Sequence, residues 1–403
     1  MRVSLSIAGD VSDSKIRPPF ALLAKGFRPF FLLAAALACS VLPLWLLVFF
    51  GVLKVDAYFD PVTWHAHEMV FGFAVGVLAG FLLTAVGNWT QRETLIGAPL
   101  AGLCALWIAG RVAVTFASAF PRGLPAIVDI AFLPMLILAL ARPLVTAKSW
   151  RNFAMLAVLG ALLVANVAIH LDALGILVGV SRTACLAGVD TVVVVLLIMT
   201  GRVLPMFTRN ATGVASVRSS PALDALAIGG MVLLTACDVG APEHWFTAVL
   251  SLVVGALALL RARTWGAPHS LREPMLWILH CGYFWIPFGL ILRGVAAFDP
   301  RVLPSLGTHA LTAGAVGSLT LGMMVRVALG HTGRPLRAPK SIVAAFALIS
   351  LGAIARVVVP LAHIEWYRPG LMVAGSLWSA AFALYLIAFA PSLCAPRVDG
   401  KLG

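Results

Sequence analysis

The sequence has few charged residues for its length. Charged side chains make up 11% of the 403 residues, whereas hydrophobic residues make up 61% and the mean hydropathy is +1.00. A soluble domain carries about 25% charged residues, so the composition excludes an ordinary soluble protein and indicates an integral membrane protein. The net charge of +13 does not indicate nucleic-acid binding, because the basic residues are scattered over short connections between apolar runs.

Cysteine is also scarce, and its spacing carries no metal-binding pattern. The six cysteines form no CxxC pair and no finger-like spacing. This argues against a disulfide framework and against a cysteine-ligated iron–sulfur cluster. Residues 1–20 are polar and lack an apolar core, so we expect no cleavable signal peptide.

Twelve apolar runs are long enough to cross a membrane as helices, which takes about 20 residues each. They fall near residues 29–50, 64–87, 97–117, 122–141, 150–170, 182–207, 222–240, 244–263, 273–297, 305–329, 341–362 and 368–391. We therefore expect an all-α integral membrane protein, a single bundle of about twelve transmembrane helices over residues 29–391. An N-terminal segment (1–28) and a C-terminal tail (392–403) flank it.

The distribution of Lys and Arg predicts the orientation of the bundle. The termini and the connections after even-numbered runs hold 19 basic residues, whereas the other connections hold five. Because basic connections tend to stay in the cytoplasm, both termini are predicted to be cytoplasmic. The connections after odd-numbered runs then define the outer side.

The stretch WHAHEMVFG, residues 64–72, opens the second apolar run. On an α-helix His65, Gly72 and Gly76 share a face, whereas His67 points about 200° away from His65. One interpretation is an axial imidazole at His65 with a haem lying over the glycines. The other is glycine-mediated helix packing, with the histidines capping or pairing at the membrane boundary.

Most histidines are predicted at the outer side, and imidazole suits iron and copper alike. The candidate metal ligands are His65, His67, His170, His309 and His363. A histidine at a membrane boundary is also often only hydrogen-bonded. That simpler interpretation suits His170, which shares a helix face with Asn166 at i, i+4.

Ionisable groups inside the apolar runs are few and lie toward the outer side. Carboxylates are the usual proton relays inside membranes, and the candidate catalytic groups are Glu68, Asp129 and Asp190. Guanidinium groups bind carboxylates such as haem propionates well, and the candidates are Arg111, Arg293 and Arg356. The competing interpretation is Arg–Asp pairing within the bundle.

Several stretches of the chain resemble the NnrS family of membrane proteins. The first is GFRPFFL (26–32), and the second is WHAHEM (64–69), which continues to AGFLLTAV (79–86) and NWT (88–90). The third is GRVLP (201–205) with Phe207, Thr208 and Asn210. The fourth runs from HALT (309–312) through Met323, Met324 and Arg326 to GHTGRP (330–335), and the last is PRVDG (396–400). One departure is Gly87, where the family pattern leads us to expect proline. It alters a helix end and involves no candidate ligand.

The resemblance implies a bacterial inner-membrane protein that binds haem, of b type, with copper as a further metal, and that acts in nitric oxide stress or denitrification. Twelve spans with histidines opening the second and tenth are also similar to the plan of haem–copper oxidases, in which these two helices carry haem ligands. The usual copper histidines of the sixth and seventh spans are absent here. Copper would therefore bind elsewhere among the outer histidines, or a conventional copper site is lacking.

Two functions stay open at this point. The first is an enzyme that binds nitric oxide and reduces it to nitrous oxide, with His65 or His67 and His309 holding haem iron. Its electrons would come from a quinol or a periplasmic cytochrome. The second is a non-catalytic membrane protein that handles or inserts haem or copper.

Overall fold

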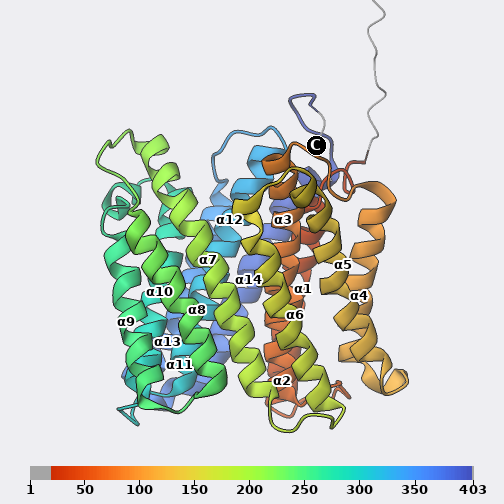
Figure 1. Ribbon diagram of the computed structural model, residues 1–403, viewed down its shortest axis with the longest axis vertical. Coiled ribbons are helices and arrows are strands. Elements are labelled where there is room, and N and C mark those ends of the chain that lie inside the picture. Colours follow the sequence, from red (N-terminus) through yellow and green to blue (C-terminus); the bar gives the residue numbers. More distant parts are fainter. Residues whose placement is uncertain (1–19, 402–403) are drawn as a thin grey trace, which may run out of the picture.

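The computed structural model describes residues 20–401, and this part of the chain is all-helical. Twelve of its helices are long and apolar enough to cross a membrane, which confirms the predicted twelve-span bundle (Figure 1). The first six spans are α1 (Phe27–Phe49), α2 to α3 (Pro61–Thr90), α4 (Gly97–Thr115), α5 (Leu124–Thr146), η3 with α6 (Trp150–Ala173) and α7 (Ser181–Thr212). The last six are α8 (Pro221–Gly240), α9 (Trp245–Ala262), α10 (Pro274–Ala296), α11 to α12 (Pro304–His331), α13 (Lys340–Ala362) and η6 with α14 (Ile364–Cys394).

Helix starts follow local sequence signals. Asp60 caps α2 (Pro61–His67), where its carboxylate accepts hydrogen bonds from the backbone N–H groups of Val62 at 3.0 Å and Thr63 at 3.2 Å. A capping carboxylate and a proline in the first turn both favour a helix start. Helix ends are less evident from hydropathy, since α5 and α7 continue to Thr146 and Thr212, beyond the predicted 141 and 207.

Two spans contain a π-helical segment next to a candidate ligand. Segment η1 (Glu68–Ala74) lies between α2 and α3 (Val75–Thr90), directly after His67. Segment η5 (Ala310–Val316) lies between α11 (Pro304–His309) and α12 (Gly317–His331), directly after His309. π-Segments are rare and occur frequently at functional sites. Their wider turns move the side chains that follow onto other faces than an α-helix would.

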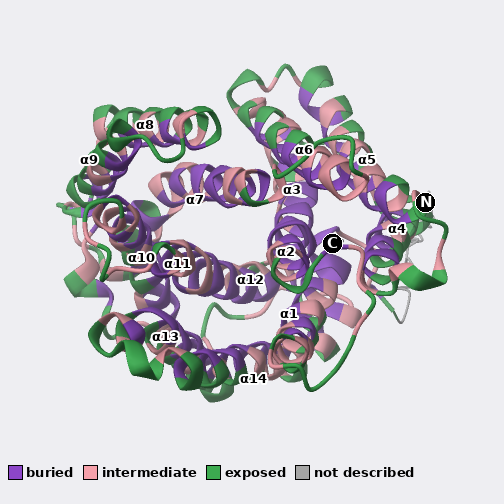
Figure 2. Cartoon of the chain, turned by 90° about the horizontal axis from the view of Figure 1, so that it is seen from below, coloured by how far each residue is buried: buried purple, intermediate pink, exposed green. Residues whose placement is uncertain are grey.

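The second, sixth and tenth spans form the interior of the bundle. Figure 2 shows α3, α7 and α12 inside, with α4 to α6, α8 to α10, and α13, α14 and α1 around them. The second span is the most buried of the twelve. Its side chains therefore face protein on nearly all sides rather than lipid.

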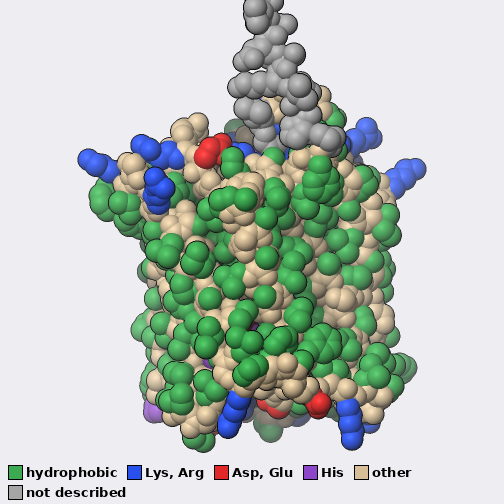
Figure 3. All heavy atoms as spheres, turned by 90° about the vertical axis from the view of Figure 1, so that its right-hand side faces the viewer, with side chains coloured by type: hydrophobic (Ala, Val, Ile, Leu, Met, Phe, Trp, Pro, Cys, Tyr) green, Lys and Arg blue, Asp and Glu red, His purple; other side chains and the backbone are tan. Residues whose placement is uncertain are grey.

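Both ends of the described chain lie at the same end of the bundle. The backbone N–H of Ala21 donates a hydrogen bond to the carbonyl oxygen of Cys394 at 2.7 Å. We call the opposite end the distal end; α2 and α11 lie there (Figure 1). Figure 3 shows hydrophobic side chains along the middle of one face, with Lys and Arg mainly toward the end that holds the termini. An uncharged belt of this kind suits lipid contact.

Candidate functional site

His65 and His67 point into two different sites on opposite sides of the second span. His65 lines a large cavity, which we call the main cavity, and its ring stacks on Trp45 with centroids 4.1 Å apart. His67 is fully buried in a polar cluster on the other side. The predicted divergence of the two rings is confirmed, because both residues lie in the regular α-helical turn that precedes η1.

The main cavity has a volume of about 860 Å³ and reaches the distal end of the bundle. His65 and His309 both line it, although 244 positions separate them in the sequence (309 minus 65). Its walls are mainly apolar, with Met69, Phe73 and Trp378 among them. The volume falls within the range of about 300–1,000 Å³ that ligand pockets occupy.

His309 is held in one orientation by its own helix. Its Nδ1 lies 2.7 Å from the carbonyl oxygen of Ser305. Because a carbonyl oxygen only accepts hydrogen bonds, Nδ1 carries the proton and Nε2 keeps its lone pair. A backbone carbonyl commonly holds metal-binding histidines in this way.

Arg356 lies beside His309 and has unused donors. Its Nη2 lies 3.1 Å from His309 Nδ1 and 3.4 Å from His309 Nε2, and it donates to Tyr367 Oη at 3.2 Å. The Nε and Nη1 atoms are buried and have no hydrogen-bond partner among the described residues. A guanidinium group in this state favours an anionic group at the cavity wall.

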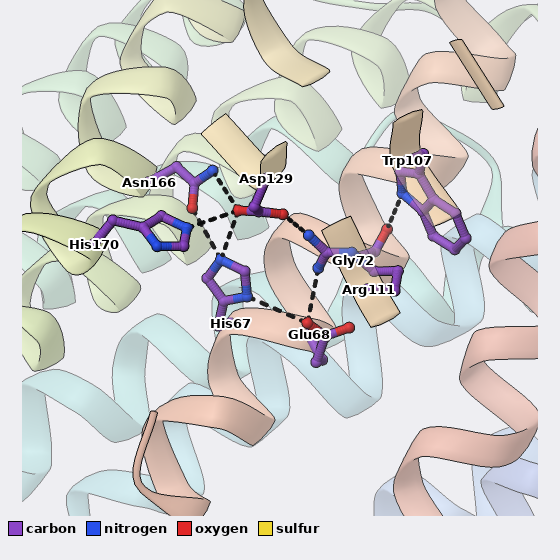
Figure 4. Close-up of polar contacts among 8 residues, drawn as sticks. All are labelled: His67, Glu68, Gly72, Trp107, Arg111, Asp129, Asn166 and His170. Atoms are coloured by element: carbon purple, nitrogen blue, oxygen red, sulfur yellow. Dashed lines mark hydrogen bonds and ion pairs between the residues drawn. The ribbon is translucent and has the colours of Figure 1, made fainter. Parts of the chain in front are cut away.

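The second site is a cluster centred on Asp129, which we call the Asp129 cluster (Figure 4). Asp129 Oδ2 lies 3.2 Å from His67 Nε2, 2.9 Å from His170 Nε2 and 2.9 Å from Asn166 Nδ2. Asp129 Oδ1 pairs with Arg111, and Arg111 also donates to Glu68 Oε1 at 2.9 Å. Its members are His67, Glu68, Arg111, Asp129, Asn166 and His170, and all of them are buried.

Hydrogen-bond counting leaves one contact of the His67 ring unmet when the imidazole is neutral. His67 Nδ1 lies 3.4 Å from Glu68 Oε1, while Nε2 faces Asp129 and, at 2.9 Å, Asn166 Oδ1. A neutral imidazole carries only one N–H, so one ring nitrogen would face an acceptor unpaired. A second proton on His67, or a metal ion, resolves this conflict. The ligand atoms of His67, Asp129 and His170 lie within 4.8 Å of one another and could hold such an ion.

Arg293 binds two carboxylates instead of remaining free. Its Nη1 is 2.6 Å from Asp190 Oδ1, and its Nη2 is 2.6 Å from Asp238 Oδ2. The competing interpretation of the sequence, pairing of arginine with carboxylate, therefore describes Arg111 and Arg293. Of the three arginines predicted to bind propionates, Arg356 has no carboxylate partner among the described residues.

The glycines of the second span do not line the cavity with His65. A Cβ atom on Gly72 would meet Leu37 at 2.7 Å, and one on Gly76 would meet Trp107 at 3.4 Å. The prediction of one face shared by His65 and these glycines is wrong, because η1 changes the helical register after His67. The glycines instead admit close contacts from α1 and α4, as the packing interpretation expected.

The remaining candidates are dispersed. His363 lies at the exposed distal surface, where its Nδ1 is 3.3 Å from Glu365 Oε1, and it does not line the main cavity. His170 was predicted to be either a metal ligand or only hydrogen-bonded. It belongs to the Asp129 cluster. Asp238 escaped the sequence analysis, although it is a carboxylate near the outer end of the seventh apolar run, which was a usable signal.

The fold and the two sites define a polytopic membrane protein with a histidine-lined cavity and a separate buried His/Asp/His group. The family model described as NnrS protein matches residues 21–397. The chain therefore belongs to the NnrS family. Comparison with curated proteins found no match.

Proposed function

We propose that the protein binds a b-type haem in the main cavity, between His65 and His309, and reduces nitric oxide to nitrous oxide. The observation that carries the proposal is the convergence of two imidazoles from the second and tenth spans on one large apolar cavity. This matches the haem–copper oxidase plan that the sequence resembles, where the same two spans supply haem ligands.

The side chains at the cavity fit a haem in three respects. His65 Nδ1 is buried without a hydrogen-bond partner among the described residues. His309 presents the lone pair of Nε2, since Nδ1 donates to Ser305. Arg356 has two unused donor atoms that suit a propionate. Haem iron, when bound, would supply a redox centre that passes electrons to nitric oxide in the cavity.

The side chains of the protein would bind and orient the haem and shield the reaction from bulk water. Two molecules of nitric oxide, two electrons and two protons give one nitrous oxide and one water. A quinol or a periplasmic cytochrome would deliver the electrons. The apolar walls around Phe73 and Trp378 would exclude bulk water while admitting a small apolar substrate.

We further propose that the Asp129 cluster binds a transition-metal ion, copper being the metal that the family resemblance suggests. Two imidazoles and a carboxylate are suitable ligands for such ions. Asn166 and Arg111 would orient Asp129 through the hydrogen bond and ion pair described above. His65 and His67 would then serve two centres from opposite faces of one helical turn.

The test for haem is the optical spectrum of the purified protein. His65→Ala and His309→Ala should each lower the haem content or shift the Soret band, because each removes a ligand. His269→Ala is the matched control, since this histidine is exposed near the other end of the bundle. Unchanged spectra in both cavity variants would refute the assignment.

The test for the second site is metal analysis of the same preparations. His67→Ala and His170→Ala should each abolish bound copper while leaving the Soret band in place. If copper content is equal in wild type and both variants, the cluster is a protonated hydrogen-bond network instead.

The alternative function is a non-catalytic membrane protein that handles haem or copper. A nitric oxide consumption assay with an artificial reductant separates the two. Consumption that depends on His309 supports the enzyme. Absence of consumption, together with transfer of haem to an added apo-haem protein, supports the handler.

A further inference from the structure

The Arg293 triad, formed by Asp190, Arg293 and Asp238, brings together three spans at the distal half of the bundle. Asp190 comes from α7, Asp238 from α8 and Arg293 from α10. One guanidinium group holds both carboxyl groups at 2.6 Å each. The two carboxyl groups are therefore neighbours around one guanidinium group.

The charges of this triad do not cancel if both carboxyl groups are ionised. Asp190 is fully buried, and its Oδ2 has no hydrogen-bond partner among the described residues. Asp238 is 9% exposed. One positive and two negative groups leave a net negative charge in a medium of low dielectric constant, which is costly. Two carboxyl groups that share a site commonly solve this by keeping one proton between them.

The other charged groups near the triad do not remove the imbalance. Those that line the same cavity are Arg182, Arg356, Asp60, Glu243 and His244. Arg356, on α13, contacts His309 on α11 and Tyr367 on α14. The other four, Arg182, Asp60, Glu243 and His244, are exposed at the distal mouth, where water screens them.

We propose that Asp190 and Asp238 share one proton and form the proton-holding site of the main cavity, filled from the distal side. Among the described residues that line the cavity, Asp238 is the buried carboxylate. The loop that follows its helix, with Glu243 and His244, lines the mouth of the same cavity. Glu68 and Asp129 lie in the Asp129 cluster, behind the second span, and do not line it.

The use of this proton rests on the proposed function, but its presence does not. In nitric oxide reduction the oxygen atom released as water takes up two protons, and the triad would supply them one at a time. Each proton would leave the carboxyl group for the cavity, and another from the distal mouth would replace it. The resting protein should hold the shared proton whether or not haem, reductant or nitric oxide is present.

The experiment is infrared spectroscopy of the purified protein at neutral pH, in H₂O and in D₂O. A protonated carboxyl group gives a C=O stretching band, separate from those of carboxylates, that shifts in D₂O. Asp190→Asn and Asp238→Asn should each remove one such band completely. Asp60→Asn is the matched control, because asparagine keeps the helix cap while a carboxyl group at the cavity mouth is lost.

A further variant distinguishes loss of the shared proton from misfolding of the protein. Asp238→Glu should keep a protonated carboxyl band at a shifted frequency, since the charge balance with Arg293 is retained. Identical spectra in wild type, Asp190→Asn and Asp238→Asn would overturn the proposal. Because the band is read without haem or nitric oxide, this failure differs from failure of the haem spectrum or of the consumption assay.

Discussion

At the residue scale, the two candidate sites diverge from a pair of histidines separated by a single alanine. His65 and His67 diverge so widely that one lines an open cavity and the other a closed cluster. The cluster is held together by hydrogen bonds and ion pairs, and at the cavity Arg356 keeps two donor atoms without a partner among the described residues. We therefore expect substitutions at the cavity to weaken ligand binding and substitutions in the Asp129 cluster to destabilise the protein.

Arg356→Ala should weaken haem binding about ten- to a hundredfold, because a charge-assisted hydrogen bond contributes about 1.5–3 kcal/mol. Arg356→Lys should weaken it less, since lysine keeps the charge but loses the planar fork. The measurement is titration of the haem-free protein with haem. Tyr367→Phe is the control, because it removes only the hydroxyl that contacts Arg356. Equal affinities in wild type and Arg356→Ala would assign this arginine a purely structural role.

Asp129→Ala should destabilise the protein by about 3–5 kcal/mol, the usual result of removing one partner from a buried ion pair. Arg111, His67 and His170 would each lose their contact with this carboxylate. Unfolding of the detergent-solubilised protein measures the effect. Asp299→Ala, at an exposed loop where the carboxylate pairs only locally with Arg301, should change stability little. A similar small change for Asp129→Ala would mean that the cluster is hydrated.

At the element scale, the two π-segments and the glycines of the second span determine how the helices approach each other. Segment η1 turns Gly72 toward α4, where a Cβ would also lie 3.1 Å from Arg111. Further along, Gly80 contacts α1, where its Cβ would lie 2.9 Å from Phe30 Cβ and 3.0 Å from the Phe31 ring. Close approach through glycine is a common way for membrane helices to pack.

Gly80→Ala should therefore destabilise the bundle by about 1–3 kcal/mol, the usual effect of overpacking a tight contact. Gly160→Ala is the matched control in α6, since nothing lies within 4 Å of the added Cβ and alanine favours the helix. Thermal unfolding in detergent compares the two variants. If both have the stability of wild type, α1 can move away from the second span at little cost.

At the scale of the whole molecule, the buried chemistry is concentrated toward one end. Both candidate sites and the Arg293 triad lie toward the distal end, and the chain ends lie at the other. The positive-inside rule predicts that the distal end faces the outside of the cell. Protons for the cavity should then come from outside, with little charge moved across the membrane.

Liposomes containing the protein, an electron donor and nitric oxide test this prediction. The pH should rise in the compartment that faces the distal end, because that side supplies the protons. Asp238→Asn should slow both proton uptake and turnover several-fold. Proton loss from the opposite compartment, with normal turnover in Asp238→Asn, would show that another route exists.

The sequence by itself determined the membrane class, the number of spans and most of their starts. Length, hydropathy and capping residues such as Asp60 act locally, so they can be read along the chain. The opposite directions of His65 and His67 were also predictable, because one regular helical turn contains both.

Only the tertiary structure decided which groups meet. It brought His309 to the cavity of His65, Asp129 and His170 to His67, and Asp238 to Arg293, each pair from different spans. These contacts depend on how helices pack across the bundle, which hydropathy does not encode. The two π-segments were likewise decided by the tertiary structure, because their register follows from the packing around them and not from the helix propensity of their residues.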